Sequence, residues 1–270
     1  MKKSKLLILF LLSTIVVFGQ YKRKPKDPFP KAPQFEQSGW ILSPGMIYSI
    51  GNPLISDVYD AAKNITSSLA QKPKTGLYLE GGRYNILNKL YFFRYLDYGL
   101  AYKMTRGIEN FTNTQDTGLG PFEIGSGENR FTDHSVNLFF NMSNIILLSD
   151  KLFLQNSIGL LGEFFAVSKR IDTNPYTRGW VPNSIRSEVT YKFGVGFKPN
   201  PRMLIIPSIQ ASILNLTPWQ GLSFMLPYFS SEFKPIVLSV RVLFLSKTKS
   251  KYCPPVDAIG IPEAIEKQQR

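Results

Sequence analysis

The segment Asp133-His134-Ser135 holds the only histidine of the chain between a carboxylate and a hydroxyl. These three residue types perform general-base and nucleophilic chemistry in many hydrolases. Consecutive side chains of a strand point to opposite faces, however, so adjacent residues cannot form a hydrogen-bonded relay among themselves. On a strand, His134 would share the lipid-facing side with Val136. We predict no catalytic residue, and a lipid-modifying barrel enzyme that uses His134 is the alternative.

Residue types that bind metals are sparse. Cys253 is the single cysteine, so the chain can form neither an intrachain disulfide nor a thiolate cluster. Glu109, Asp116, Glu123 and Glu128 could offer oxygen ligands to calcium, but their spacing is too wide for a known calcium loop. We therefore predict no metal site and no cofactor.

A third set of charged residues falls on the polar side of alternating, strand-like segments. Four are acidic and four are basic. A charge inside a narrow barrel is tolerated only when it is paired and hydrogen-bonded. The sequence predicts an interior charge network in two neutral layers, with Glu80, Asp97, Lys192 and Arg241 near mid-height and Lys103, Glu163, Arg186 and Glu188 toward the long-loop end.

Eight strand-like segments would position these charges. The connections after the first, third, fifth and seventh segments have roughly twenty to thirty residues and the others about two to six, an alternation typical of barrels that cross a bilayer. The prediction is an all-β fold, a closed antiparallel transmembrane β-barrel of about eight strands, with segments at 39–50, 74–84, 91–105, 134–148, 151–165, 185–198, 201–214 and 235–246.

The two-residue alternation of these segments is clearest at 185–198. One side carries Val189, Tyr191, Phe193, Val195 and Phe197, and the other carries Glu188, Thr190, Lys192, Gly194 and Gly196. A wall with lipid outside and a polar interior requires this pattern. Pro44 and Pro207 interrupt two segments, and we expect each to mark a bulge or a strand end because proline lacks an N–H.

The first long connection has a different periodicity. Val58, Ala62, Ile65 and Leu69 recur at helical spacing after Pro53. This spacing predicts a short amphipathic helix that either caps the barrel mouth or offers a groove to a partner.

The whole layout resembles the small eight-stranded outer-membrane barrels of Gram-negative bacteria, the class that includes the transmembrane domain of outer-membrane protein A. The resemblance covers about residues 39–246 and rests on the strand count, the alternation and Leu243-Phe244 at the end of the last strand. It implies an outer-membrane location, insertion by the barrel-assembly machinery and termini in the periplasm. In the common pattern the last aromatic strand ends the chain. This chain departs from that pattern, because about two dozen residues follow the last predicted strand.

The two ends of the chain are predicted to lie outside the barrel. Residues 1–19 read as a cleaved signal peptide, 20–38 as a basic, proline-rich arm, 39–246 as the barrel and 247–270 as a periplasmic tail. Basic, proline-rich arms gain affinity by folding onto a surface. The residues predicted to dock partners are Lys22, Arg23, Lys24, Lys26, Lys247, Lys249 and Lys251.

The net charge of +13 makes an anionic partner plausible, and export makes lipid and lipopolysaccharide headgroups that partner rather than nucleic acid. An eight-stranded barrel leaves room only for its own side chains, which disfavours a general pore. The sequence therefore favours a non-enzymatic structural or accessory subunit of an outer-membrane complex for barrel insertion, secretion or uptake, bound to other outer-membrane or periplasmic proteins. The alternatives are a narrow pore and the enzyme that uses His134.

Overall fold

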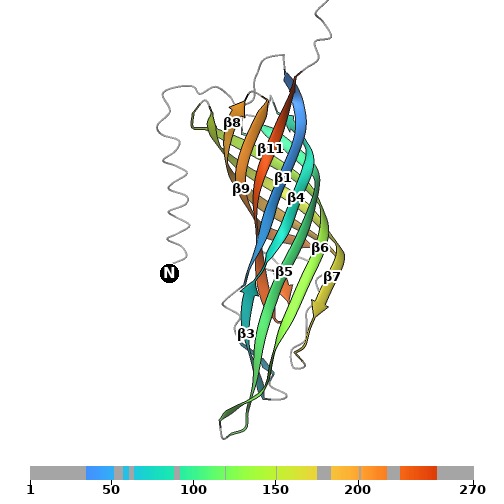
Figure 1. Cartoon of the computed structure of the whole chain (residues 1–270), viewed down its shortest axis with the longest axis vertical. Coiled ribbons are helices and arrows are strands. Elements are labelled where there is room, and N and C mark those ends of the chain that lie inside the picture. Colours follow the sequence, from blue (N-terminus) through green and yellow to red (C-terminus); the bar gives the residue numbers. More distant parts are fainter. Residues whose placement is uncertain are drawn as a thin grey trace, which may run out of the picture.

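The computed structural model describes residues 35–51, 57–60, 64–87, 92–118, 120–149, 151–174, 184–200, 202–217 and 226–247. These residues form one sheet of eleven strands, of which β2 (Asp57–Asp60), β3 (Ile65–Pro73) and β10 (Leu226–Tyr228) are accessory to the wall (Figure 1). The wall strands are β1 (Phe35–Gly51), β4 (Thr75–Ile86), β5 (Tyr95–Asp116), β6 (Pro121–Leu147), β7 (Leu152–Ile171), β8 (Ile185–Asn200), β9 (Met203–Thr217) and β11 (Ser231–Lys247).

The wall closes into a ring. β1 pairs with β4 on one side and with β11 on the other. The remaining pairs are antiparallel and run in order from β4 through β5, β6, β7, β8 and β9 to β11. A closed ring leaves no unpaired edge in the wall, which is the condition for β structure to cross a bilayer. The predicted fold, an all-β closed antiparallel barrel of eight strands, is confirmed.

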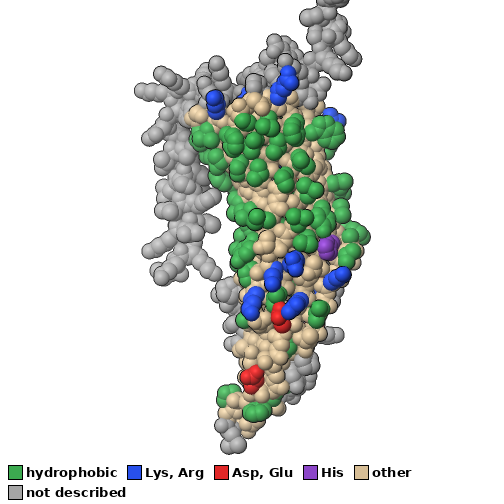
Figure 2. Space-filling view, in the orientation of Figure 1, with side chains coloured by type: hydrophobic (Ala, Val, Ile, Leu, Met, Phe, Trp, Pro, Cys, Tyr) green, Lys and Arg blue, Asp and Glu red, His purple; other side chains and the backbone are tan. Residues whose placement is uncertain are grey.

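The outside of the wall is apolar over much of its height. Leu138 is 68% exposed and Leu100 57%, although both are large apolar side chains. Figure 2 shows hydrophobic side chains spread over this part of the wall, with basic side chains above and below them. We call this zone the apolar belt and define it by the outward residues Leu77, Leu79, Leu100, Tyr102, Val136, Leu138, Phe140, Leu160 and Phe164. No helix in the described part of the chain is long and apolar enough to cross a membrane.

β5 and β6 extend far beyond the belt, where the sequence led us to expect a long loop. They have 22 and 27 residues and stay paired from Tyr95 with Ser143 to Asp116 with Pro121. Only residues 117–120 connect them. The prediction of a long loop is therefore wrong. This part of the chain is a continuous hairpin, and its tip lies at the end of the molecule opposite to the start of β1 (Figure 1).

The amphipathic helix expected around residues 58–69 is also wrong. Val58 lies in β2, and Ile65 and Leu69 lie in β3, which pairs with the extension of β5. Ile65 and Leu69 are both buried. Residues four positions apart share a face in a strand as well as in a helix, so the spacing did not discriminate between the two. Ala62 lies outside the described residues.

Each of the two prolines is paired on one side, whereas the ladder on its other side has a gap at the proline and resumes in the same register. Pro44 pairs with Leu79, and Pro207 pairs with Val240. In both ladders the register is the same before and after the proline, and both strands continue beyond it. The expected bulge or strand end at each proline is therefore wrong. A proline is tolerated in this way where its missing N–H faces a site that the ladder leaves without a bond.

The two ends of the wall meet at the short-turn end, where Phe35 pairs with Lys247. β1 begins inside the range expected for the N-terminal arm, and β11 ends at the first residue of the expected tail. The predicted signal peptide, the rest of the two arms and the docking residues Lys22, Arg23, Lys24, Lys26, Lys249 and Lys251 lie outside the described residues. Lys247 is the last residue of β11.

Candidate functional site

The interior of the barrel is built of alternating apolar and charged layers. Along β11 the inward side chains include Leu245 and Leu243, then Arg241 and Ser239, then Val237 and finally Phe233, and all six are buried. Leu243, Val237 and Phe233 belong to three separate apolar clusters. Because inward residues of neighbouring strands share the same levels, each strand adds side chains to the same stack.

The first charged layer lies between the apolar cluster at the short-turn end, which contains Leu243, and the middle cluster, which contains Val237. Arg241 places Nη2 at 2.8 Å from Asp97 Oδ2 and 3.2 Å from Glu80 Oε1. Lys192 places Nζ at 2.9 Å from Glu80 Oε2, which also accepts a hydrogen bond of 2.6 Å from the hydroxyl of Tyr78. Each acidic side chain therefore has a basic partner, as burial of these charges requires.

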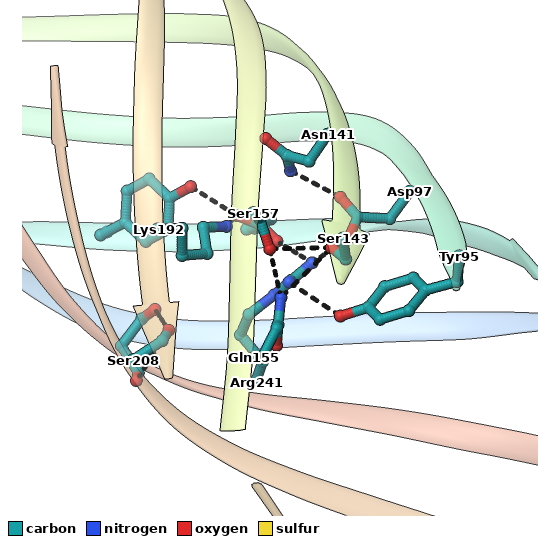
Figure 3. Close-up of polar contacts among 12 residues, drawn as sticks. Tyr95, Asp97, Asn141, Ser143, Gln155, Ser157, Lys192, Ser208 and Arg241 are labelled. Atoms are coloured by element: carbon teal, nitrogen blue, oxygen red, sulfur yellow. Dashed lines mark hydrogen bonds and ion pairs between the residues drawn. The ribbon is translucent and has the colours of Figure 1, made fainter. Parts of the chain in front are cut away.

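Neutral polar side chains surround this layer. Asn141 donates to Asp97 through Nδ2 at 2.5 Å, and the hydroxyls of Ser143 and Ser157 lie 2.8 Å apart. Figure 3 shows Asp97, Arg241 and Lys192 pointing toward one another, with Tyr95 and Gln155 beside them. The layer therefore spans the lumen from β5 to β8 and β11.

The second charged layer lies farther toward the long-hairpin end. Lys103 places Nζ at 3.3 Å from Glu163 Oε1 and 3.8 Å from Glu188 Oε1. Arg186 pairs with Glu163 and lies 4.0 Å from Glu188. Glu188 also accepts a hydrogen bond of 2.5 Å from Ser212. The structure thus brings the eight interior charges named from the sequence into two groups of four, each with two acids and two bases.

An aromatic cluster covers the second layer at the long-hairpin end. The rings of Phe131 and Tyr228 stack with centroids 3.6 Å apart and an interplanar angle of 6°. Phe233 meets Phe131 edge to face at 5.1 Å, and Leu226 and Phe229 complete the cluster. We call these five residues the aromatic plug. β10 pairs with β11 and folds the plug into the barrel mouth.

Beyond the plug lies a polar interior that the extensions of β5 and β6 enclose. Glu109 accepts a hydrogen bond of 2.9 Å from Asn129, and Asn113 accepts one of 2.6 Å from Ser67. Glu109 is fully buried. Burial raises the pKa of the Glu109 carboxyl, although the hydrogen bond from Asn129 partly opposes the shift.

The residues considered for catalysis do not face one another. His134 points outward, and its Nδ1 lies 2.6 Å from the hydroxyl of Tyr102 on β5. Asp133 and Ser135 are buried inside, where Asp133 accepts a hydrogen bond of 2.5 Å from Ser168 and Ser135 donates one of 2.6 Å to Glu163. A relay through His134 would need one of these groups on the outer face.

Two features of the site were missed from the sequence. The aromatic plug joins Phe131 to the far segment at 226–233, and no local spacing signals that contact. A group of outward cations on β3, β5 and β6 borders the apolar belt. The only indication of this group in the sequence was a basic residue just before each run of alternating apolar residues. Among the described residues, no cluster of three or more His, Cys, Asp or Glu could hold a metal ion.

Comparisons with known proteins agree on the type of fold at low similarity. No family model and no curated protein matches the sequence. Among solved structures, the outer membrane protein OprG from Pseudomonas aeruginosa is 9% identical, with 80% of this chain and 98% of that chain covered and a TM-score of 0.36. Ail, the attachment invasion locus protein of Yersinia pestis, in complex with the heparin analogue sucrose octasulfate, is 13% identical, with 78% and 100% covered and a TM-score of 0.29.

These scores are too low to carry an argument, and the class of the protein follows from its own geometry. A closed ring of eight antiparallel strands with an apolar outer belt and a filled interior defines a small transmembrane β-barrel.

Proposed function

We propose that this chain is a non-enzymatic outer-membrane barrel that acts as a structural or accessory subunit of a larger outer-membrane complex. The observation that supports this role most directly is the filled lumen. Three apolar clusters alternate with two paired charge layers, and Arg241 and Lys192 are 0% and 1% exposed. A barrel closed in this way offers its outer surfaces and its terminal segments, rather than a channel, for function.

The orientation belongs to the same proposal. The long hairpin of β5 and β6 faces the outside of the cell, and the termini face the periplasm. An even number of strands places the start of β1 and the end of β11 at one end, where Phe35 pairs with Lys247. Short turns on the periplasmic side and long extensions outside are the usual arrangement in such barrels.

The experiment that tests the subunit role is isolation of the full chain from its own host in mild detergent, followed by native gel electrophoresis and cross-linking. We expect the chain in a complex larger than the single barrel. A variant without residues 248–270 should still form the barrel, seen as heat-dependent gel mobility, and should lose much of the larger complex. A chain that migrates alone under all detergent conditions, or a truncated chain that keeps all its partners, would contradict the proposal.

Two measurements address the alternatives. In planar bilayers the purified chain should give no steady ion conductance, and an open channel would favour the narrow pore. Release of fatty acid from lipopolysaccharide by the wild-type chain, abolished in His134→Ala with folding intact, would favour the enzyme.

A further inference from the structure

The outward cations next to the apolar belt form a compact group across adjacent strands. Lys72 of β3 pairs with Ile108 of β5, which pairs with Arg130 of β6. One row closer to the belt, Arg106 of β5 pairs with Thr132 of β6, which pairs with Lys169 of β7. The pairing places these basic residues on the same outer face, one or two strands apart.

These cations are exposed and surround a shallow cavity. Lys72, Lys74, Arg106 and Arg130 are all exposed, and together with Glu128 they line a cavity of about 370 Å³. Ile108 and Phe131 also line it, so the cavity is not purely polar. Figure 2 shows the basic side chains gathered just beyond the green belt on this face. We call Lys72, Lys74, Arg106 and Arg130 the basic rim.

The basic rim and the apolar belt are separated by only one or two rows of paired outward residues along the strands. The row after Arg106 and Thr132 is Leu77, Met104, His134 and Val167, and the next contains Leu79, Tyr102, Val136 and Phe164. Successive outward rows lie about 7 Å apart along the strands. A molecule whose charged group binds the basic rim would therefore place the part next to that group against side chains of the apolar belt.

Glu128 is the one acidic side chain of the cavity. It binds Arg130 through two contacts, at 2.9 Å to Nε and 3.1 Å to Nη2. The hydrogen bond from Arg130 lowers the pKa of the Glu128 carboxyl, so this carboxylate stays ionised and holds the guanidinium in place. The four cations and one carboxylate leave a net charge of three positive units around the cavity.

We propose that the basic rim binds the phosphate groups of a phosphorylated glycolipid of the outer leaflet, with the acyl chains of that lipid on the adjoining apolar belt. This inference rests on the orientation given under the proposed function. Phosphate is an anion that several lysine and arginine side chains bind together. A soluble polyanion would use the same cations, but it would gain nothing from the adjoining row of Leu77, Met104 and Val167.

The test uses the purified full chain in nanodiscs of a zwitterionic lipid and measures the binding of bisphosphorylated lipid A. The test variant combines Lys72→Gln, Lys74→Gln and Arg106→Gln. The matched control combines Lys151→Gln, Lys198→Gln and Arg202→Gln, which removes the same charge at the short-turn end. Each lysine or arginine near an anionic surface contributes about fivefold to affinity, so we expect roughly hundredfold weaker binding in the test variant. The control should change the affinity less than about threefold.

Two further probes separate the lipid from other anions. Monophosphorylated lipid A should bind about fivefold more weakly than the bisphosphorylated form, because it lacks one phosphate. Inositol hexakisphosphate, a soluble polyanion, should compete poorly. Glu128→Gln should tighten lipid A binding, since it frees Arg130 and removes the only carboxylate of the cavity. Equal binding of the wild type and the test variant, or equal affinity for lipid A and inositol hexakisphosphate, would overturn the proposal.

Failure of this proposal and failure of the subunit role are distinguishable. Lipid binding is measured on the isolated chain, whereas the subunit role is measured on complexes from cells. The orientation has its own test, in which Ser126→Cys, at an exposed position of the extension, in a Cys253→Ser chain is labelled on intact cells with a thiol reagent that cannot cross the membrane. Labelling places the hairpin outside. Absence of labelling, together with lipid A binding by the rim, would assign the phosphates to lipid of the inner leaflet and overturn the proposal as stated.

Discussion

The barrel wall and the hairpin extension of β5 and β6 use the same strands but differ in the polarity of their outer face. Within the apolar belt, Leu138 and Phe140 of β6 face outward, and Asn137 and Asn141 are buried inside. Beyond the belt, Arg130 faces outward and Phe131 is buried in the aromatic plug. The strand keeps its two-residue period while the surroundings of its outer face change from lipid to water, so the polarity of the outer face, rather than the strand itself, marks the membrane boundary.

The largest expected effect comes from breaking the interior of the wall. Arg241→Met leaves Asp97 without its cation and Glu80 with Lys192 alone. Removing one partner of a buried ion pair costs about 3–5 kcal/mol because it leaves an uncompensated charge. Denaturant unfolding in detergent, followed by gel mobility, measures the loss. The control Val240→Ala on the neighbouring outward position should change stability much less. Similar midpoints for the two variants would mean that the paired layer does not stabilise the barrel.

The same layer can be tested from its other cation. Lys192→Ala leaves Glu80 with Arg241 as its only basic partner. We expect a lower midpoint of unfolding than in the wild type and a smaller loss than in Arg241→Met, because Arg241 serves two carboxylates and Lys192 serves one. The order of the three midpoints is the measurement, and a reversed order would contradict the geometry of the layer.

The aromatic plug should stabilise the hairpin extension and the barrel mouth against local unfolding, and it should contribute little to the stability of the wall. Phe131→Ala removes the ring that stacks on Tyr228, and deletion of a buried phenylalanine side chain costs about 3–5 kcal/mol. Hydrogen exchange should therefore quicken around β10 and in the extension, with little change in β8 and β9. Phe122→Ala is the control because Phe122 is 65% exposed near the tip. Uniform loss of protection over the whole barrel would show that plug and wall unfold as one unit.

The boundary itself can be tested with one added charge on each side of it. Leu138→Lys places an ammonium group against the hydrocarbon, at a cost of about 2–4 kcal/mol if it lies near mid-bilayer. Ser126→Lys, on an exposed position of the extension, should leave stability unchanged. Reversible unfolding in lipid vesicles compares the two variants. Equal costs would mean that the belt does not define the membrane zone.

The smallest expected effect is a pH dependence of the extension. Because burial raises the pKa of Glu109 above its unfolded value, the folded extension holds this proton more tightly than the unfolded chain. The extension should therefore gain stability as the pH falls through the raised pKa toward the unfolded one, and the gain should end below it. In Glu109→Gln this dependence should disappear. Hydrogen exchange in β5 and β6 across that pH window makes the comparison, and the same pH profile in both chains would exclude Glu109 as the cause.

The wall could be predicted from sequence because the lipid and the lumen impose opposite polarities on alternate residues. Lys192 and Arg241 stand out as charges within otherwise apolar or small-residue runs, and the period of two assigns them to the interior. Their levels follow from counting residues from the turns. The partner of each charge was not determined, because several acids lie at similar heights and only the register selects among them.

The extension could not be predicted in the same way. A rule that looks for apolar residues facing outward ends β5 near Thr105, since Arg106 begins the polar outer face. Glu109 then reads as a residue of a solvated loop, although it is fully buried. The basic rim was missed for a related reason. Lys72, Arg106 and Arg130 come from three strands and Lys74 from the turn between β3 and β4, so only the register of β3, β5 and β6 brings them together.

The length of β6 has a consequence for how the cell surface meets its surroundings. A strand of 27 residues measures roughly 90 Å along its axis, whereas a tilted crossing of the hydrocarbon takes only about 9–11 residues. In the proposed orientation, most of the remainder rises through the sugar layer of the outer leaflet as a stiff ribbon. Its tip, at Gly118 and Gly120, would be the first described part of the protein within reach of a phage, an antibody or a neighbouring cell.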